Sequence, residues 1–445
     1  MKIKRLIEFF TFFSLPLFWL FVLQANALEI ESWETSNGSR VMFYHAPEIP
    51  MVDIRLVFAA GSVRDGERFG LSRMANKLLL EGSGGSNAKE FKDRLSETGA
   101  RLYAGSLREM AFINLRTLAE KNYFNTAVEL LVDAVSSPNY DESELDKVIE
   151  EMLFELSLRD ESPNEIAQEA IWSKIYEDHP YSNYPGGTKS TVPTISSSHL
   201  REFHSKYYVA NNMTIAIVGS LKKSEAKDVA NRISSSLSRG ERATKIPEFS
   251  NFKSSESYIE TNSRQTHIRI GTLGISRSDE DYFPMIVGNH ILGGSSLVSL
   301  LFDEIRTKRG LSYSVYSYFI PTEIKGPFIL GLQTNGDKQY TALRESLRVL
   351  NNFVSNGPSK EQFELAKKNL ISGFINRIDS NDKMIGYISM MGFYDLPLNY
   401  LQTFTAKVKS VSIVDVKDCF QRRFQQNFSI VLVGSEKNAF GNNER

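Results

Sequence analysis

The sequence predicts an α+β fold built from two homologous halves, and three observations support this prediction. Residues 211–220 read NNMTIAIVGS and residues 426–435 read QNFSIVLVGS, with five of the ten positions identical. Each half also shows the same order of elements: an apolar strand, a glycine turn, a helix ended by glycine, and later a long amphipathic helix. Strands and helices mix without strict βαβ alternation, which favours mostly antiparallel sheets packed with helices.

In the first half, an apolar run over 52–60 predicts a strand that ends at a turn. A helix is expected from 69 to 80, ended by Gly82, and a long amphipathic helix from 141 to 158. In the second half, residues 267–273 predict the matching strand. Helices are expected there over 281–292 and 360–378, and the first of these ends at a glycine pair.

The chain has 445 residues, which exceeds what one hydrophobic core organises well. Its 41% hydrophobic and 24% charged residues exclude disordered, fibrous and multi-span membrane proteins. Lys and Arg number 52 against 53 Asp and Glu, so the charge favours no nucleic-acid partner. The single cysteine, Cys419, cannot form an internal disulfide, and its apolar helical surroundings predict a buried thiol.

The first 27 residues are typical of an export signal: a basic start, an apolar run and the cleavage pattern Ala25-Asn26-Ala27. Cleavage after Ala27 would remove three cations and Glu8, so the net charge of −1 would become −3. An uncleaved anchor is the alternative, because 19 residues from Phe9 to Ala27 carry no charge. We expect an exported protein of the bacterial periplasm.

These boundaries divide the chain into four parts. Residues 1–27 form the signal peptide and 28–240 the N-terminal domain. The Ser-rich and charged residues 241–257 form a linker, and 258–445 form the C-terminal domain.

The sequence contains no motif for nucleotide or serine-nucleophile chemistry. The glycine cluster at 82–85 follows a helix and lacks the Lys-Ser/Thr of a P-loop, so it is interpreted as a turn. His199 and His204 flank a glutamate, but five residues along a helix leave their side chains roughly 140° apart. They cannot hold one ion together, and the other four of the 6 histidines are scattered singly.

The segment GLSRMANKLLLEGS at 70–83 resembles the helix that carries H-x-x-E-H in the insulinase/pitrilysin family of zinc peptidases, which includes processing-peptidase-like proteins. In that family the two His bind zinc and the Glu activates water. The register places Arg73 and Lys77 at the His positions and Asn76 at the Glu. The spacing is kept, and every catalytic residue type is replaced.

The resemblance also assigns the third zinc-ligand position to Glu155, eight residues before Pro163. It implies a degenerate site in which Arg73 and Lys77 supply the positive charge that Zn²⁺ would have given this carboxylate. The alternative is a solvated polar helix face unrelated to Glu155. Arg cannot lose its proton and Lys does so only at high cost, so we expect no metal in this chain.

Further motifs extend the resemblance over about residues 29–437. His179-Pro180-Tyr181 is similar to the pattern near the end of the family's first domain, and IRTKRGLSYSVYS at 305–317 matches its Arg-x6-Tyr signature through Arg306 and Tyr313. The resemblance implies a clamshell of two halves around a chamber. Without it, Tyr313 would be a packing residue in a strand and Arg306 a helix C-cap.

The resemblance implies a non-catalytic, substrate-positioning subunit of a periplasmic zinc peptidase heterodimer. Arg306 and Tyr313 would contact a peptide or unfolded protein in the partner's active site, and the partner would hold the zinc. An extended substrate would add to a sheet edge, near residues 61–64 or in the second half. A stand-alone peptide-binding or scaffold protein and an independent hydrolase stay open as alternatives.

Overall fold

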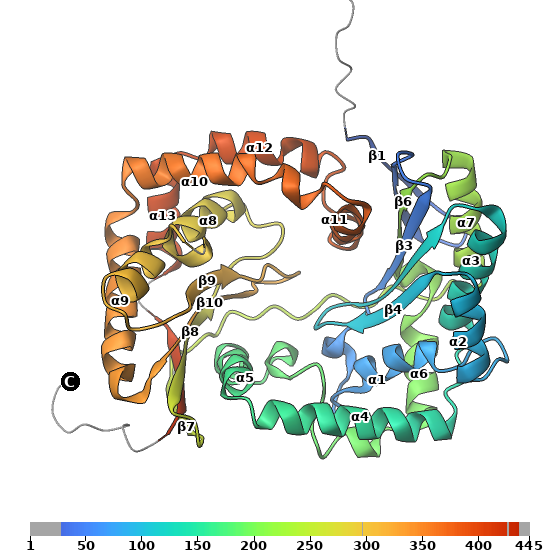
Figure 1. Ribbon diagram of the computed structural model, residues 1–445, viewed down its shortest axis with the longest axis horizontal. Helices are drawn as coiled ribbons and strands as arrows, with labels where there is room; N and C mark the ends of the chain where they lie inside the picture. The colour runs from blue at the N-terminus through green and yellow to red at the C-terminus, as the bar shows by residue number, and fades with distance from the viewer. Residues whose placement is uncertain (1–27, 296, 425–426, 436–445) are drawn as a thin grey trace, which may run out of the picture.

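A computed structural model describes residues 28–295, 297–424 and 427–435. The predicted signal peptide, residues 1–27, lies outside the described residues. The chain forms two β-sheets, one from each half, and helices pack on both of them (Figure 1). This arrangement confirms the α+β class. Among the described residues, no helix is both long and apolar enough to cross a membrane.

The first sheet has six strands in the order β1-β2-β6-β3-β5-β4. Strands β2 and β6 are parallel, and every other neighbouring pair is antiparallel. Central β6 is buried along its whole length, as its unbroken apolar sequence requires. The strands are β1 Ile30–Glu34, β2 Arg40–His45, β3 Met51–Phe58, β4 Arg101–Ser106, β5 Ala111–Leu118 and β6 Met213–Gly219.

The second sheet repeats this plan with five strands in the order β7-β11-β8-β10-β9. Here β7 and β11 are parallel and the other pairs are antiparallel. Strands β6 and β11, which contain the two similar Gly-Ser-ended segments, therefore take equivalent central places. The strands are β7 Glu256–Glu260, β8 Gln265–Leu273, β9 Val315–Phe319, β10 Pro327–Asn335 and β11 Ser429–Gly434.

Helices follow the same division, with seven α-helices before the second sheet begins and six after it among the described residues. Several begin at a side-chain cap: Asn87, Ser162, Ser196, Ser359 and Ser412 each accept a backbone N–H of the first turn. The helices are α1 Leu71–Lys77, α2 Ala88–Glu97, α3 Lys121–Ser136, α4 Glu142–Asp160, α5 Pro163–Tyr176, α6 Ser197–Tyr207, α7 Lys223–Ser235, α8 Tyr282–Asn289, α9 Gln339–Asn356, α10 Lys360–Ser372, α11 Asn381–Phe393, α12 Tyr400–Ser410 and α13 Ile413–Arg423.

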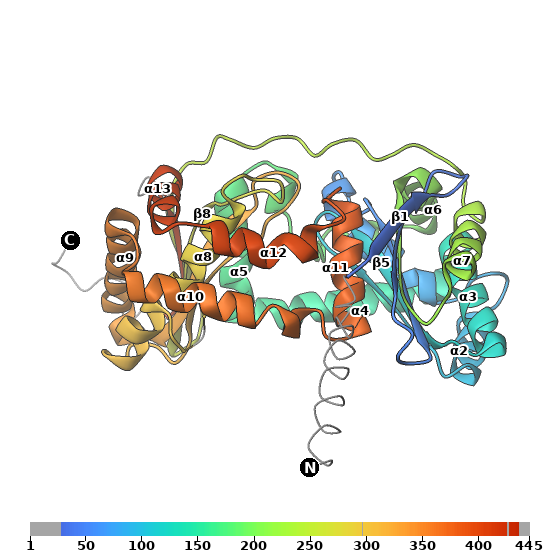
Figure 2. The same cartoon turned by 90° about the horizontal axis from the view of Figure 1, so that it is seen from above.

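One helix of each half packs on the β-sheet of the other half. Helix α5, from the first half, packs on β8 and β11, and helix α11, from the second half, packs on β2, β3 and β6. In Figures 1 and 2, α11 lies beside the first sheet and α5 beside the second. Because each sheet face is completed by the other half, the two halves are joined through their cores.

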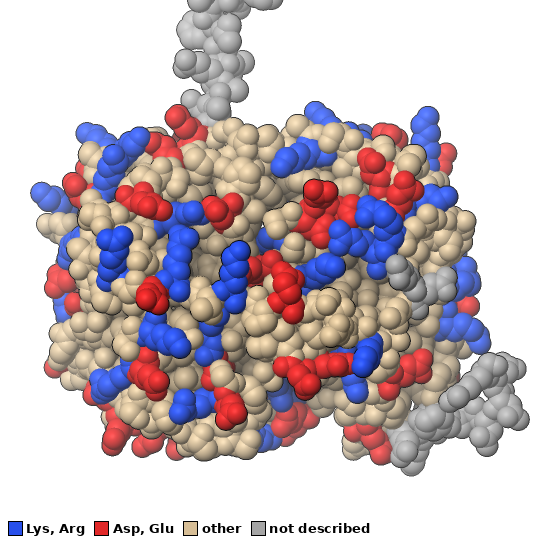
Figure 3. Space-filling view, turned by 180° about the vertical axis from the view of Figure 1, so that it is seen from behind, with Lys and Arg blue, Asp and Glu red and all other residues tan. Residues whose placement is uncertain are grey.

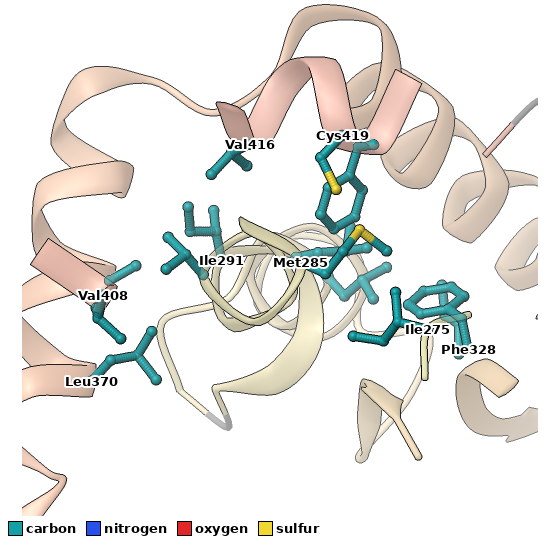
Figure 4. Close-up of a cluster of buried hydrophobic side chains, with 14 of the residues drawn as sticks. Ile275, Met285, Ile291, Phe328, Leu370, Val408, Val416 and Cys419 are labelled. Carbon is teal, nitrogen blue, oxygen red and sulfur yellow. The ribbon is translucent and has the colours of Figure 1, made fainter. Parts of the chain in front are cut away.

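The second half has its own apolar core around α8, shown in Figure 4. Ile275, Met285 and Phe328 pack there with Val416 of α13. Cys419 is fully buried in this cluster, so the predicted structural thiol is confirmed. Burial raises the pKa of the thiol to about 12, because the thiolate would lose its hydration.

Several element boundaries differ from the predictions. The helix expected to 80 ends as an α-helix at Lys77 and continues as a 3₁₀ turn over Leu78–Leu80. The helix expected to 378 ends at Ser372, where Gly373 caps it. Strand β7 begins at Glu256, so the last two residues of the expected linker belong to the second sheet.

Candidate functional site

Helix α1 carries the positions matched to the zinc motif, and its first turn is fixed by Asp65. The Asp65 carboxylate accepts the N–H groups of Gly70 and Ser72, both at 2.8 Å. Gly70 has a φ of +97° and lies against Gly187, so a side chain there would be strained and crowded. Burial raises the pKa of Asp65 to about 8, although the two N–H groups oppose that shift.

Arg73 and Lys77 both bind Glu155 of α4. Arg73 Nη2 lies 2.6 Å from Glu155 Oε2 and Lys77 Nζ lies 3.0 Å from Oε1. Lys77 also reaches Glu151 at 3.2 Å. The four side chains are 27% to 62% exposed, so this is a partly solvated ion-pair cluster. The interpretation of an unrelated polar face is wrong, because both cations contact Glu155.

Asn76 is directed differently from its two neighbours. It is buried, and its Nδ2 donates to Tyr208 Oη at 3.2 Å and to the Phe112 carbonyl at 3.3 Å. Asn76 therefore belongs to the core of the first half, while Arg73 and Lys77 reach outward to α4. Arg73 and Lys77 therefore contact Glu155, whereas Asn76 bonds within the core.

These donors do not suit zinc. Guanidinium and ammonium groups carry no lone pair for a metal at ordinary pH, and Asn76 already donates within the core. Within the described ranges, no three His, Cys, Asp or Glu side chains are grouped so that they could hold a metal ion. His199 and His204 have separate structural partners. His199 Nδ1 accepts the Ser196 N–H at the start of α6, and His204 Nε2 lies 2.9 Å from the Val135 carbonyl of α3.

Arg306 and Tyr313 form the second candidate set, in the other half. Arg306 lies in a π-helical turn, Phe302–Thr307, and its guanidinium carbon is 4.3 Å from the centroid of the Tyr313 ring. The same guanidinium lies 4.8 Å from the Phe302 ring. Tyr313 precedes β9 and is 76% exposed, so it is not the strand packing residue of the alternative interpretation. Cation–π stacking holds the pair together at the surface.

The outer strands of the two sheets offer candidate edges for an extended peptide. Among the described residues, β4 forms one edge of the first sheet and pairs with β5, and β9 forms one edge of the second sheet and pairs with β10. Strands β1 and β7 form the opposite edges. The expected edge near residues 61–64 is wrong. Ser62 N–H donates to Leu107 O at 3.0 Å and Val63 N–H donates to Arg108 O at 2.9 Å, so this segment is already paired.

Glu109 is a buried carboxylate that sequence reasoning missed. It accepts the hydroxyl of Tyr181 in the first half, and in the second half the Tyr394 hydroxyl at 2.5 Å and the Glu323 N–H at 2.8 Å. Burial raises its pKa, and the three donors partly offset the shift. Glu109 therefore ties the halves together, through partners distant in the sequence that no local motif reveals.

Comparisons with known proteins agree with this architecture. The model of the insulinase family (peptidase family M16) matches residues 40–189, and the model described as the peptidase M16 inactive domain matches residues 194–370. A solved peptidase M16 inactive domain from Pseudomonas fluorescens is 33% identical with a TM-score of 0.89, covering 92% of this chain and 98% of that one.

Curated relatives extend along nearly the whole chain. An uncharacterized zinc protease, YmxG, of Bacillus subtilis is 25% identical over 92% of this chain and 99% of its own length. A Helicobacter pylori relative described as a non-peptidase homolog is also 25% identical, over 93% of this chain and 96% of its own length. Together with the loss of the zinc-binding residue types in α1, these matches show that the chain belongs to the insulinase family, peptidase family M16, as an inactive member.

Proposed function

We propose that this chain is the substrate-positioning subunit of a periplasmic zinc peptidase heterodimer. The observation that carries the proposal is the contrast between the two candidate sites. In the first half, Arg73 and Lys77 occupy the zinc positions and bind Glu155. In the second half, Tyr313 is exposed and held by Arg306, so both can reach a group outside this chain.

The chemistry of the pair suits acyl transfer in a partner's site. A Tyr hydroxyl can donate a hydrogen bond to a developing oxyanion, and an Arg guanidinium can bind a peptide carbonyl or stabilise the same charge. Neither role needs a metal in this chain. The zinc, and the glutamate that activates water, would come from an H-x-x-E-H homologue.

The substrate would be a peptide or unfolded segment in extended form. Strand β4 pairs with β5 on one side and has no strand on its other side among the described residues. Its exposed apolar side chains include Tyr103, with Leu107 just beyond the strand. An added strand would gain main-chain hydrogen bonds there and apolar contacts on alternate residues. This edge belongs to the same half as the degenerate zinc site.

Reconstitution with an H-x-x-E-H homologue from the same genome tests the proposal. Tyr313→Phe and Arg306→Ala should each lower the pair's kcat/KM by roughly 10²-fold, in the range for loss of one oxyanion donor. Tyr340→Phe is the matched control, because Tyr340 is an exposed tyrosine on α9. An unchanged rate in both site variants would refute the in-trans role. If the chain forms a homodimer and does not bind the homologue, the result would favour a stand-alone binding protein.

Export is tested separately. Intact-mass measurement of the protein from a periplasmic extract should give a chain that begins at Leu28, after removal of the first 27 residues. Retention in the membrane fraction with Met1 present would instead support an uncleaved anchor.

A further inference from the structure

A basic cavity of about 550 Å³ lies where the two halves and the linker meet. The first half contributes Arg40 and Arg64, the linker contributes Arg242 and Lys245, and the second half contributes Arg277. Figure 2 shows the linker running along one edge of the molecule, and Figure 3 shows that Lys and Arg side chains on the face seen from behind are interspersed with Asp and Glu. The volume lies in the range of small-molecule sites, roughly 300–1,000 Å³.

The lining carries excess positive charge. Two carboxylates, Glu323 and Asp395, accompany the five cations, so the formal charge of the lining is +3. Asp395 pairs with Arg40 at 2.5 Å. Within the part of the chain that the structure describes, the other four cations make no ion pair within 4.0 Å. Like charges that share a hollow repel one another, and a bound anion would relieve that repulsion.

Arg64 and Arg277 retain unused donors. Arg64 donates from Nη2 to the Thr244 carbonyl at 2.5 Å and from Nη1 to the Thr244 hydroxyl at 3.3 Å. Arg277 Nη1 lies 3.5 Å from the Tyr282 hydroxyl, and its guanidinium carbon lies 5.3 Å from the centroid of the Tyr394 ring. The Nε of each is covered and has no acceptor among the described residues. A guanidinium offers five N–H donors in a fork that suits phosphate and carboxylate oxygens. Both side chains therefore have the capacity to bind an oxyanion.

We propose that this cavity binds a small, multiply charged oxyanion. A trianion would neutralise the +3 lining, and it would bridge cations from the first half, the linker and the second half. Binding would therefore hold the linker against both halves. The proposal does not depend on Arg306, Tyr313 or any partner peptidase. Pyrophosphate probes the phosphate form of the ligand, and citrate probes the carboxylate form.

Trypsin digestion of the full chain provides the test. Residues 238–255 have no regular secondary structure, and Arg242 and Lys245 are exposed cleavage sites at the cavity. Lys253 is an exposed site in the same segment but outside the lining, so it is an internal control. Pyrophosphate at ten times its Kd should slow cleavage after Arg242 and Lys245 roughly tenfold and leave Lys253 unchanged.

Variants locate the effect. Arg64→Gln combined with Arg277→Gln should abolish the protection, and Arg264→Gln, at an exposed arginine outside the cavity, should preserve it. In case the double variant does not fold, calorimetry on Lys245→Gln should show weaker pyrophosphate binding than wild type. Equal slowing at all three sites, protection in the folded double variant, or no heat with either probe would overturn the proposal. If citrate protects the two sites as well as pyrophosphate does, the cavity binds carboxylate ligands as well as phosphate ligands.

Discussion

The substitution Lys77→Met tests whether an ion-pair cluster has replaced the metal in α1. Lys77 Nζ lies 3.0 Å from Glu155 and 3.2 Å from Glu151. Partly exposed pairs contribute roughly 0.2–1 kcal/mol each, so losing both should lower the free energy of unfolding by about 1 kcal/mol. Breaking a fully buried pair would cost about 3–5 kcal/mol. That larger cost is not expected, because Glu155 is 40% exposed and keeps Arg73 at 2.6 Å.

The pairing itself is measured by a double-mutant cycle. Glu155→Gln in the Lys77→Met background should cost less than in the wild type, with a coupling energy of about 0.5–1 kcal/mol. Lys368→Met on α10 is the control, because Lys368 is exposed and should change stability by less than about 0.5 kcal/mol. Met and Lys have similar helix propensities, so the comparison isolates the charge.

Urea unfolding followed by circular dichroism supplies these values, provided that the m-value is unchanged between variants. The coupling should shrink in about 1 M NaCl, where the Debye length falls to about 3 Å. Additive effects, with a coupling below about 0.3 kcal/mol at low salt, would refute the replacement of zinc by a cation–carboxylate cluster.

Three buried groups outside this cluster also give measurable outcomes. Burial raises the pKa of Glu109, so its contribution to stability is full below the unfolded value of about 4.3 and is lost as pH rises through the folded value. The stability of the wild type relative to Glu109→Gln should therefore fall as pH rises above about 4, and a flat difference contradicts this. Asp65→Ala should lower the free energy of unfolding by roughly 2 kcal/mol, because the N–H groups of Gly70 and Ser72 lose a buried acceptor. A loss below about 0.5 kcal/mol in urea unfolding would show that water replaces the carboxylate. Cys419 should react with a disulfide reagent only after unfolding, because its thiol is buried and its pKa is raised to about 12. Rapid labelling of the folded chain would disprove that burial.

Local patterns predicted the elements whose own residues determine them. The alternating and unbroken apolar runs of β3, β6, β8 and β11 identify strands wherever they pack. The exchange of α5 and α11 between the halves had no local signal. Both helices carry several buried apolar residues, and only the tertiary arrangement decides which sheet those residues cover.

The candidate sites also differ in how far the sequence predicts their contacts. Spacing and family resemblance predicted that Arg73, Lys77 and Glu155 lie together, although 78 residues separate Lys77 from Glu155 along the chain. The burial of Asn76 depends on Tyr208, and Glu109 depends on tyrosines 72 and 285 residues away. Such contacts are fixed by how the sheets and loops meet, and a single sequence does not encode them in any short motif.

Formal charge distinguishes the two cationic positions of α1 from position 76. In an H-x-x-E-H site, two neutral imidazoles, Zn²⁺ and one ligand carboxylate have a formal charge of +1. Arg73, Lys77 and Glu155 also have a formal charge of +1, so two cations of α1 balance the Glu155 carboxylate without a metal, and Lys77 pairs with Glu151 as well. The catalytic glutamate has no such substitute, because position 76 is buried and its partners are a hydroxyl and a carbonyl. An anion there would be desolvated without a cation, and a neutral Asn76 avoids that cost.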